Sequence, residues 1–256
     1  MGHQKLPMKV KRILVSQPKP QKENHPYMQL ASKHKIDIDF RSFIEVREVG
    51  ASEFRKDKIN PKLFTSFIFT SRNAVDHFFR LCKDMRVEIN PEWKYFCTSE
   101  AVAFYLQKFV PYRKRKIYPG KGHLADLIPI MKRQRNQKFL LPTSNLLKPS
   151  IPEQLDKAGL NWTRAVMFNT VTSDLSDLED VTYDVLVFFS PEGIRSLYTN
   201  FPDFEQNGTR IAAFGNTTKK AIEEHKLRLD IAVPTEEYRS MPEALDAYVT
   251  KANKGK

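Results

Sequence analysis

The sequence repeats itself, and this internal repeat constrains the fold more than any other feature. Ile68–Val75 (IFTSRNAV) aligns with Val187–Ile194 (VFFSPEGI), and Phe96–Val102 aligns with Ala212–Thr218. A third, weaker match places Ile13–Gln17 opposite Phe139–Thr143. Since the matches recur in one order, we interpret the chain as a duplication that folds into two related units.

Strands and helices are predicted to alternate along the chain. Apolar runs of strand length occur at Arg12–Val15, Phe67–Thr70, Lys94–Thr98, Lys138–Leu141, Val185–Phe189 and Arg210–Phe214. Helical spacing of apolar residues follows at Pro26–Lys35, Asn73–Cys82, Glu100–Lys108, Pro152–Gly159 and Thr217–His225. Strands that are apolar throughout and separated by helices predict an α/β fold with parallel sheets covered on both faces.

Two extended runs, Ile38–Val46 and Thr163–Val171, are expected to connect the units as a two-stranded antiparallel ladder. The predicted first domain is then discontinuous, comprising residues 1–38 and 171–256, and residues 39–170 form the second domain. No Gly/Ser-rich linker interrupts the chain, so the ladder is the expected hinge. The tail from Lys251 to Lys256 is expected to fray.

Composition places the protein in the globular class, with 41% hydrophobic and 28% charged residues. No run of 18 apolar residues exists, and no apolar segment of signal-peptide length follows the basic N-terminus. We therefore expect a cytoplasmic protein without a membrane partner. Cys82 and Cys97 lack a CxxC spacing and are expected to be buried, reduced thiols.

The net charge of +12 is unevenly distributed. Residues 101–140 contain ten Lys or Arg and one acid, whereas residues 172–184 contain five acids and no base. Such a field attracts polyanions, either nucleic acid or a small polycarboxylate, although a solvated basic face without a ligand explains it equally well.

Ser71 and Ser190 each end an apolar strand where a helix is predicted to begin. In parallel sheets ligands bind at this edge, and helix N-termini favour carboxylates or phosphates. Serine is also a preferred helix cap, so capping is a better explanation than ligand binding for either serine taken alone. Two serines at equivalent positions of a duplication favour a shared ligand.

Phe214–Thr218 (FGNTT) is a second strand-to-helix turn, in which Gly215 permits close backbone approach and the hydroxyls and amides suit an anion. Capping by Asn216 or Thr217 is the alternative. The equivalent turn, Ser99–Val102, lacks the glycine and has gained Glu100. Only the later copy is expected to hold an anion well.

Other chemical motifs are missing from the sequence. Tyr118–His123 (YPGKGH) lacks the spacing of a phosphate-binding glycine loop and is interpreted as a turn. The six histidines show no metal-ligand spacing, and no nucleophile–base pair can be assigned. A reaction catalysed by this chain must depend on positioning and electrostatics.

The strand-serine-helix pattern at Phe69–Val75 and Phe188–Ile194, with Ala213–Thr218, is similar to that of the uroporphyrinogen-III synthases. The resemblance extends over nearly the whole chain. It implies two α/β domains joined by a two-stranded ladder, and a cofactor-independent lyase. The implied reaction cyclises hydroxymethylbilane with inversion of its last ring, ring D, and loss of water.

The resemblance also implies a site. Family contacts to the tetrapyrrole come mainly from backbone amides and hydroxyls at cleft-facing strand ends, which here are Ser71, Ser190, Gly215, Asn216, Thr217 and Thr218. The catalytic group is unknown, because Phe168 stands where the family often has a tyrosine proposed to assist loss of the hydroxyl. Gln17 replaces a common arginine. Lys148, or Lys19 near the cleft, could compensate electrostatically for the missing tyrosine.

We expect a monomer whose partners are the tetrapyrrole and the upstream hydroxymethylbilane-producing enzyme, without metal, cofactor or nucleic acid. The alternative is a non-catalytic protein of the same fold that binds RNA or another polyanion through residues 101–140. Four aromatics interleave with that charge, as in single-strand binding, but their helical spacing predicts that they pack in the core: Phe104, Tyr105, Phe109 and Tyr112.

Overall fold

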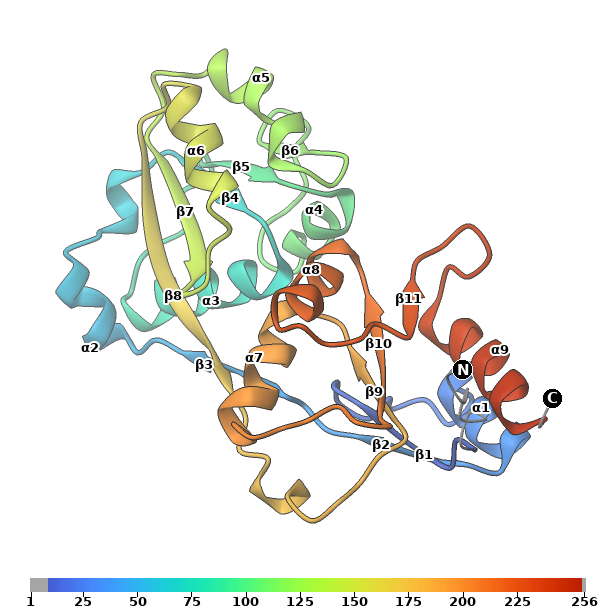
Figure 1. Cartoon of the computed structure of the whole chain (residues 1–256). Helices are drawn as coiled ribbons and strands as arrows, with labels where there is room; N and C mark the ends of the chain where they lie inside the picture. The colour runs from blue at the N-terminus through green and yellow to red at the C-terminus, as the bar shows by residue number, and fades with distance from the viewer. Residues whose placement is uncertain (1–8, 255–256) are drawn as a thin grey trace. The chain divides into compact units, whose positions relative to one another are not determined.

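The computed structural model of the chain describes residues 9–254, and these divide into two compact units (Figure 1). Unit 2 comprises Val46–Thr170, and unit 1 comprises the described residues up to Glu45 and from Val171 onward. The first boundary therefore lies seven residues beyond the predicted one. The reason is that residues 37–40 form a strand that pairs with the first strand of unit 1.

Unit 1 is built on a five-stranded parallel sheet with the order β11-β10-β9-β1-β2. Its strands are β1 (Arg12–Val15), β2 (Asp37–Phe40), β9 (Val185–Phe188), β10 (Arg210–Phe214) and β11 (Ile231–Val233). Its helices are α1 (Pro26–His34), α7 (Pro191–Asn200), α8 (Asn216–Glu224) and α9 (Met241–Asn253), with a short 3-10 turn at Ser176–Leu178.

Unit 2 contains a six-stranded sheet with the order β3-β8-β7-β4-β5-β6. Its strands are β3 (Ile44–Glu48), β4 (Ser66–Phe69), β5 (Lys94–Cys97), β6 (Ile117–Pro119), β7 (Phe139–Ser144) and β8 (Trp162–Thr172). Its helices are α2 (Ala51–Phe54), α3 (Arg72–Asp84), α4 (Glu100–Leu106), α5 (Ile128–Lys132) and α6 (Ser150–Lys157), with 3-10 turns at Arg55–Asp57, Pro61–Leu63 and Leu124–Asp126.

The strand orders of the two sheets correspond, as the duplication predicts. Reading β2-β1-β9-β10-β11 against β8-β7-β4-β5-β6 pairs β9 with β4, β10 with β5 and β1 with β7. These are the three matches found in the sequence. The predicted fold class, two related parallel-sheet α/β units, is confirmed.

The connection between the units differs in one respect from the expectation. The run Ile38–Val46 is not one strand, because β2 ends at Phe40 and β3 begins at Ile44. The return run lies within β8, which is the neighbour of β3 in the sheet. Ser173 N–H donates to Phe43 O (3.0 Å) and Val49 N–H to Met167 O (3.2 Å). This pairing runs in opposite directions along β3 and β8, so the two strands form the expected antiparallel ladder.

Strand burial explains the continuous apolar runs. In β4, Phe67 and Phe69 pack against α3 and α4, while Ile68 between them faces the other side of the sheet; all three are fully buried. Burying each phenylalanine stabilises the fold by about 2–3 kcal/mol. Cys82 and Cys97 are buried free thiols, as predicted, and burial raises the pKa of each to about 12.

The prediction that four aromatics of the basic stretch pack in the core is wrong for three of them. The exposed fractions are 75% for Phe104, 40% for Phe109 and 55% for Tyr112, while Tyr105 is half-buried. The core-facing stripe of α4 consists of Val102, Ala103 and Leu106, and the helix ends there. Phe104 consequently lies off this stripe, and Phe109 and Tyr112 follow the helix.

The expected fraying of the C-terminal tail is also wrong up to Asn253, because α9 continues to that residue. The Asn253 side chain accepts from Val10 N–H (2.8 Å) and donates to Val10 O (3.0 Å). Gly255 and Lys256 lie outside the described residues. Within residues 9–254, no helix combines the length and apolarity needed to cross a membrane.

Candidate anion-binding site at the carboxyl ends of the strands

In both units the carboxyl ends of the strands lead directly into helix N-termini. Ser71 caps α3 by accepting from Ala74 N–H (3.1 Å), and Ser190 caps α7 by accepting from Gly193 N–H (3.3 Å). Ser99 caps α4 in the same way, on Val102 N–H (3.3 Å). The capping interpretation of Ser71 and Ser190 is confirmed. Since each cap uses only a lone pair of the oxygen, the hydroxyl hydrogen can still donate to a ligand.

The start of α8 is different, because its cap residue is Gly215. Gly215 adopts φ 86° and ψ 151°, and no side chain within the described residues caps the helix. Asn216 and Thr217 lie in the first turn with exposed side chains, so the alternative that one of them caps the helix is wrong. The N–H groups of Asn216, Thr217 and Thr218 form no hydrogen bond within residues 9–254.

This first turn of α8 has the properties of an anion site. Three unpaired N–H groups and the positive end of the helix dipole favour a carboxylate. The turn equivalent to it in unit 2 uses Ser99 to satisfy its own helix. Thr218 can contribute only its N–H to a ligand in this conformation, because its side chain is fully buried and its Oγ1 has no partner in the described chain.

Unit 2 has a cavity of about 580 Å³ at the carboxyl ends of β4, β5 and β7. Its polar lining is rich in hydroxyl groups and includes two basic side chains, His123 and Lys148, but no acid among the described residues. The residues with hydroxyl groups are Thr70, Ser71, Thr98, Thr143, Ser144 and Ser150. A cavity with donors and no carboxylate suits an anionic ligand.

The Gly-rich segment Tyr118–His123 forms one edge of this cavity but is not a phosphate loop. Asp126 accepts from Lys121 N–H (2.9 Å) and His123 N–H (3.1 Å), and these hydrogen bonds hold the pKa of its carboxyl group below the usual range. Gly120 and Gly122 N–H donate to Cys97 O and Thr98 O. All four amides are therefore used. The prediction of a turn is correct after β6 ends at Pro119.

Phe168 lines the same cavity and stacks on His77, with ring centroids 4.8 Å apart. Burial lowers the pKa of His77, and the nearby Arg80 guanidinium lowers it further. Phe168 cannot donate a proton, and the lining groups able to do so are the hydroxyls, His123 and Lys148. Lys148 and Phe168 therefore line the same cavity.

We predict that the stability of the protein depends on His77 below neutral pH. The unfolded histidine takes up a proton near pH 6.5, whereas the folded one resists protonation, so acidification favours the unfolded state. The free energy of unfolding of the wild type should fall more steeply from about pH 7.5 to 5.5 than that of His77→Gln. Urea titrations at both pH values measure the free energy of unfolding of each protein. If this free energy falls by the same amount in the wild type and in His77→Gln, the prediction is contradicted.

Sequence reasoning missed two features at the carboxyl ends of the strands, one in each unit. Phe189 and Phe214 stack in unit 1 with centroids 5.9 Å apart, and Phe214 is 36% exposed, which offers an apolar surface next to Gly215. Gly122 and His123 line the cavity of unit 2. The phenylalanine pair could have been found from the sequence, since Phe189 and Phe214 each end a predicted apolar run. The position of Gly122 and His123 could not, because it depends on how β6 pairs with β5.

These features define a class: an α/β protein of two related units whose strand ends carry donors for anions. Comparison with known proteins agrees with this class. The family model of "Uroporphyrinogen-III synthase HemD" matches residues 27–242. The chain belongs to the uroporphyrinogen-III synthase family.

Individual relatives are distant. The uroporphyrinogen-III synthase of Saccharomyces cerevisiae is 24% identical over 141 residues, which is 49% of this chain and about half (50%) of the yeast protein. A mutant uroporphyrinogen III synthase from the bacterium Thermus thermophilus has a similar structure, with a TM-score of 0.62 and 14% identity over 96% of this chain and 100% of that one. The structure of the Helicobacter pylori uroporphyrinogen-III synthetase has a TM-score of 0.60 and 17% sequence identity, over 94% of this chain and 99% of that one. These two structures share the fold.

Proposed function

We propose that this protein is a uroporphyrinogen-III synthase. It cyclises hydroxymethylbilane to uroporphyrinogen III, inverts ring D and releases water. The observation that carries the proposal is the family match over residues 27–242. This activity places the protein in tetrapyrrole (haem) biosynthesis as a lyase.

The chemistry required is compatible with the groups at the strand ends. The hydroxyl of the substrate's hydroxymethyl group takes up a proton and leaves as water, giving a stabilised azafulvene cation. A pyrrole carbon of ring D then attacks this cation, the existing methylene bond of ring D moves to its other α-carbon so that the ring is inverted, and ring closure releases the proton again. Since the cation forms readily, the protein must mainly hold the substrate so that the required carbon is attacked. A substrate with eight carboxylates needs many anion donors, and a +12 protein attracts it.

We assign the substrate contacts to the edge residues by the groups they expose. Ser71 and Ser190 donate their hydroxyl hydrogens while capping their helices. Asn216, Thr217 and Thr218 offer N–H groups, which Gly215 makes accessible by leaving the α8 terminus uncapped. Lys148 lines the unit 2 cavity together with Phe168 and is our candidate for assisting the departure of the hydroxyl.

The test is an isomer assay. Purified protein is supplied with hydroxymethylbilane generated enzymatically, and the products are oxidised and separated. We expect the type III isomer. Accumulation of only the type I isomer, which forms spontaneously, would rule out the proposed function.

A substitution at Asn216 tests the amide donors separately. Asn216→Pro removes one free N–H at the first helical position, where proline is tolerated, and the preceding glycine at ψ 151° is compatible with proline. We expect tetrapyrrole affinity to fall about tenfold, as for one hydrogen bond to a charged group, with stability unchanged. Binding of uroporphyrin can be followed by fluorescence.

Asn216→Ala is the matched control, because it removes the side chain and keeps the N–H. Its affinity should equal that of the wild type. If the alanine variant loses as much affinity as the proline variant, the contact is made by the side chain and not by the backbone.

We further propose that the protein is a cytoplasmic monomer that receives its substrate from the upstream hydroxymethylbilane-producing enzyme. Light scattering coupled to gel filtration tests the monomer. A direct complex is tested by adding the upstream enzyme to the same experiment, and two unchanged peaks would contradict it.

A further inference from the structure

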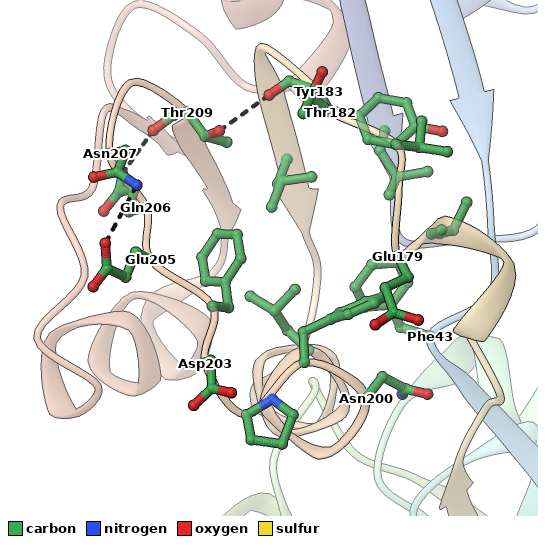
Figure 2. A pocket seen from close by; sticks show the side chains of 18 residues that line it. Phe43, Glu179, Thr182, Tyr183, Asn200, Asp203, Glu205, Gln206, Asn207 and Thr209 are labelled. Atoms are coloured by element: carbon green, nitrogen blue, oxygen red, sulfur yellow. Dashed lines mark hydrogen bonds between the residues drawn. The ribbon is translucent and has the colours of Figure 1, made fainter.

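Unit 1 contains a second cavity, of about 570 Å³, that plays no part in the proposed reaction (Figure 2). Its floor is apolar and is formed by β1, β9 and α7 through Leu14, Leu186 and Leu197. Rings from Phe43, Phe201, Phe204 and Tyr183 complete this lining. The volume is in the range of pockets that bind small organic molecules.

The cavity lies away from the strand ends that carry the anion donors of unit 1. Tyr183 and Thr209 precede β9 and β10, and the Thr209 hydroxyl donates to Tyr183 O at 3.1 Å on the cavity wall (Figure 2). Ser190 and Gly215 follow the opposite ends of the same two strands. The cavity is therefore a separate site.

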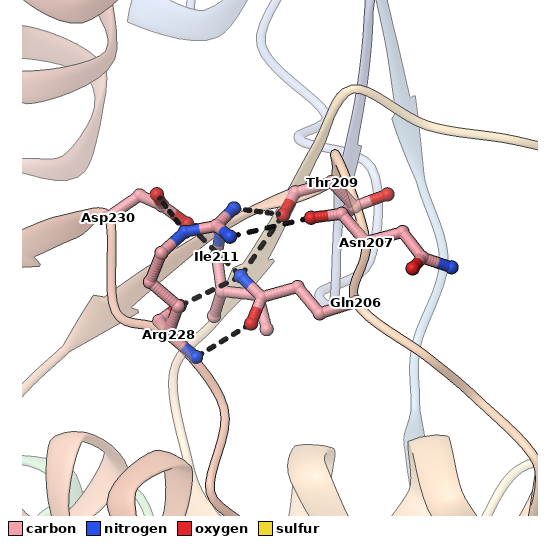
Figure 3. A network of polar contacts seen from close by, with 6 residues as sticks. All are labelled: Gln206, Asn207, Thr209, Ile211, Arg228 and Asp230. Carbon is pink, nitrogen blue, oxygen red and sulfur yellow. Dashed lines mark hydrogen bonds and ion pairs between the residues drawn. The ribbon is translucent and has the colours of Figure 1, made fainter. Parts of the chain in front are cut away.

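One wall of the cavity is fixed by a polar network around Gln206 (Figure 3). The Gln206 amide donates to Thr209 O (3.0 Å) and Asp230 Oδ2 (3.1 Å), while its Oε1 accepts from Arg228 N–H (2.6 Å). Arg228 pairs with Asp230 at 2.8 Å and donates to Asn207 O and Thr209 O. The loop between α7 and β10 is thus held in place, and the cavity is preformed.

The charged side chains among the described residues that line the cavity are all acidic. Asp203 and Glu205 lie on this loop and Glu179 lies on the opposite side (Figure 2), whereas the described lining residues include no Lys, Arg or His. Glu205 accepts from Asn207 at 3.5 Å. The carboxylates of Glu179 and Asp203 form no hydrogen bond or ion pair within residues 9–254. A polycarboxylate such as the tetrapyrrole is excluded here by repulsion.

We propose that this cavity binds a small amphipathic cation, with an aromatic or branched aliphatic body and one ammonium or guanidinium group. The body occupies the apolar floor, where it is removed from water. The cation faces Glu179 and Asp203, whose charges are uncompensated in the protein itself. The rings of Phe43, Phe201 and Phe204 favour a cation as well, whereas the ring of Tyr183 already carries the guanidinium of Arg12, 4.8 Å from its centroid. The acidic side chains select a cationic ligand. Because the loop between α7 and β10 is already held in place, little conformational entropy is lost when the ligand binds.

The probe for the test is benzamidine, whose neutral isostere is benzamide and whose anionic analogue is benzoate. Titrations of the full chain by NMR should show saturable binding of benzamidine below about 10 mM, weaker binding of benzamide and none of benzoate. In the double variant Glu179→Gln/Asp203→Asn, benzamidine affinity should fall at least fivefold. Asp180→Asn, a neighbouring acid outside the lining, is the matched control and should bind as the wild type does.

Three results would overturn the inference: no saturable binding of benzamidine, equal affinity for benzamidine and benzamide, or unchanged affinity in the double variant. Uroporphyrin affinity should be the same in the double variant and the wild type. A parallel loss of uroporphyrin binding would mean that the substitutions act on the fold rather than on this cavity.

Discussion

Gly215→Ala is expected to lower the free energy of unfolding by about 1–3 kcal/mol, because φ 86° with ψ 151° is a conformation that residues with a Cβ atom rarely adopt. A Cβ atom on Gly215 would meet no heavy atom within 4 Å, so the cost is backbone strain without a steric clash. Relief of the strain requires the turn to rotate, which redirects the N–H groups of Asn216 and Thr217. Tetrapyrrole affinity should consequently fall along with stability.

Gly50→Ala is the matched control for this prediction. Gly50 precedes α2 at φ −70°, and a Cβ atom there also meets nothing within 4 Å. Urea unfolding should show no more than about 0.5 kcal/mol of change for this variant. If the two alanine variants are equally stable, the positive φ of Gly215 is not maintained in solution.

Arg80→Met is expected to cost about 2–3 kcal/mol of stability, the second large effect. The side chain of Arg80 is only 23% exposed, and its guanidinium donates to Val49 O (2.8 Å) and Met167 O (3.3 Å). It also pairs with Asp84 at 3.0 Å and Glu48 at 3.3 Å. Methionine fills similar space but leaves both carbonyls without this charged donor. Hydrogen bonds to charged groups contribute more to stability than hydrogen bonds between neutral groups.

Arg80→Lys separates geometry from charge. Lysine keeps the positive charge near Glu48 and Asp84 but lacks the planar fork that reaches several acceptors at once, so an intermediate loss of about 1 kcal/mol is expected. Chemical denaturation of the three proteins gives the comparison. Full stability of the lysine variant would show that charge alone matters at this position.

Local pattern was sufficient to predict most of unit 1 and unit 2. The six apolar runs all form strands, and most of the predicted strand ends lie within one or two residues of the observed ones. The runs are apolar throughout because each strand is buried on both faces of a parallel sheet. The strands that were not predicted are β6 and β11. Each is three residues long and lies at a sheet edge, where a strand needs fewer apolar residues and leaves little signal in the sequence.

The candidate site could be predicted from the sequence where a single residue determines the local backbone conformation. Gly215 marked an open helix terminus, and Ser71 and Ser190 marked helix starts. Burial relative to a neighbouring element could not be read from the sequence. The side chain of Thr218 proved to be enclosed, and Phe104 proved to lie off the core-facing stripe of α4. Both outcomes depend on packing against segments distant in the chain.

The interleaved order of the strands has a consequence for synthesis on the ribosome. Unit 2 is continuous, so it can fold as soon as β8 has emerged. In unit 1, β1 must pair with β9, with Ile13 opposite Val185, and Asn253 must reach Val10. The first strand to be made therefore waits with one edge unpaired through most of translation. A chain that stops soon after residue 172 should consist of a finished unit 2 attached to β1 and β2, with the β9-facing edge of β1 open and prone to aggregation.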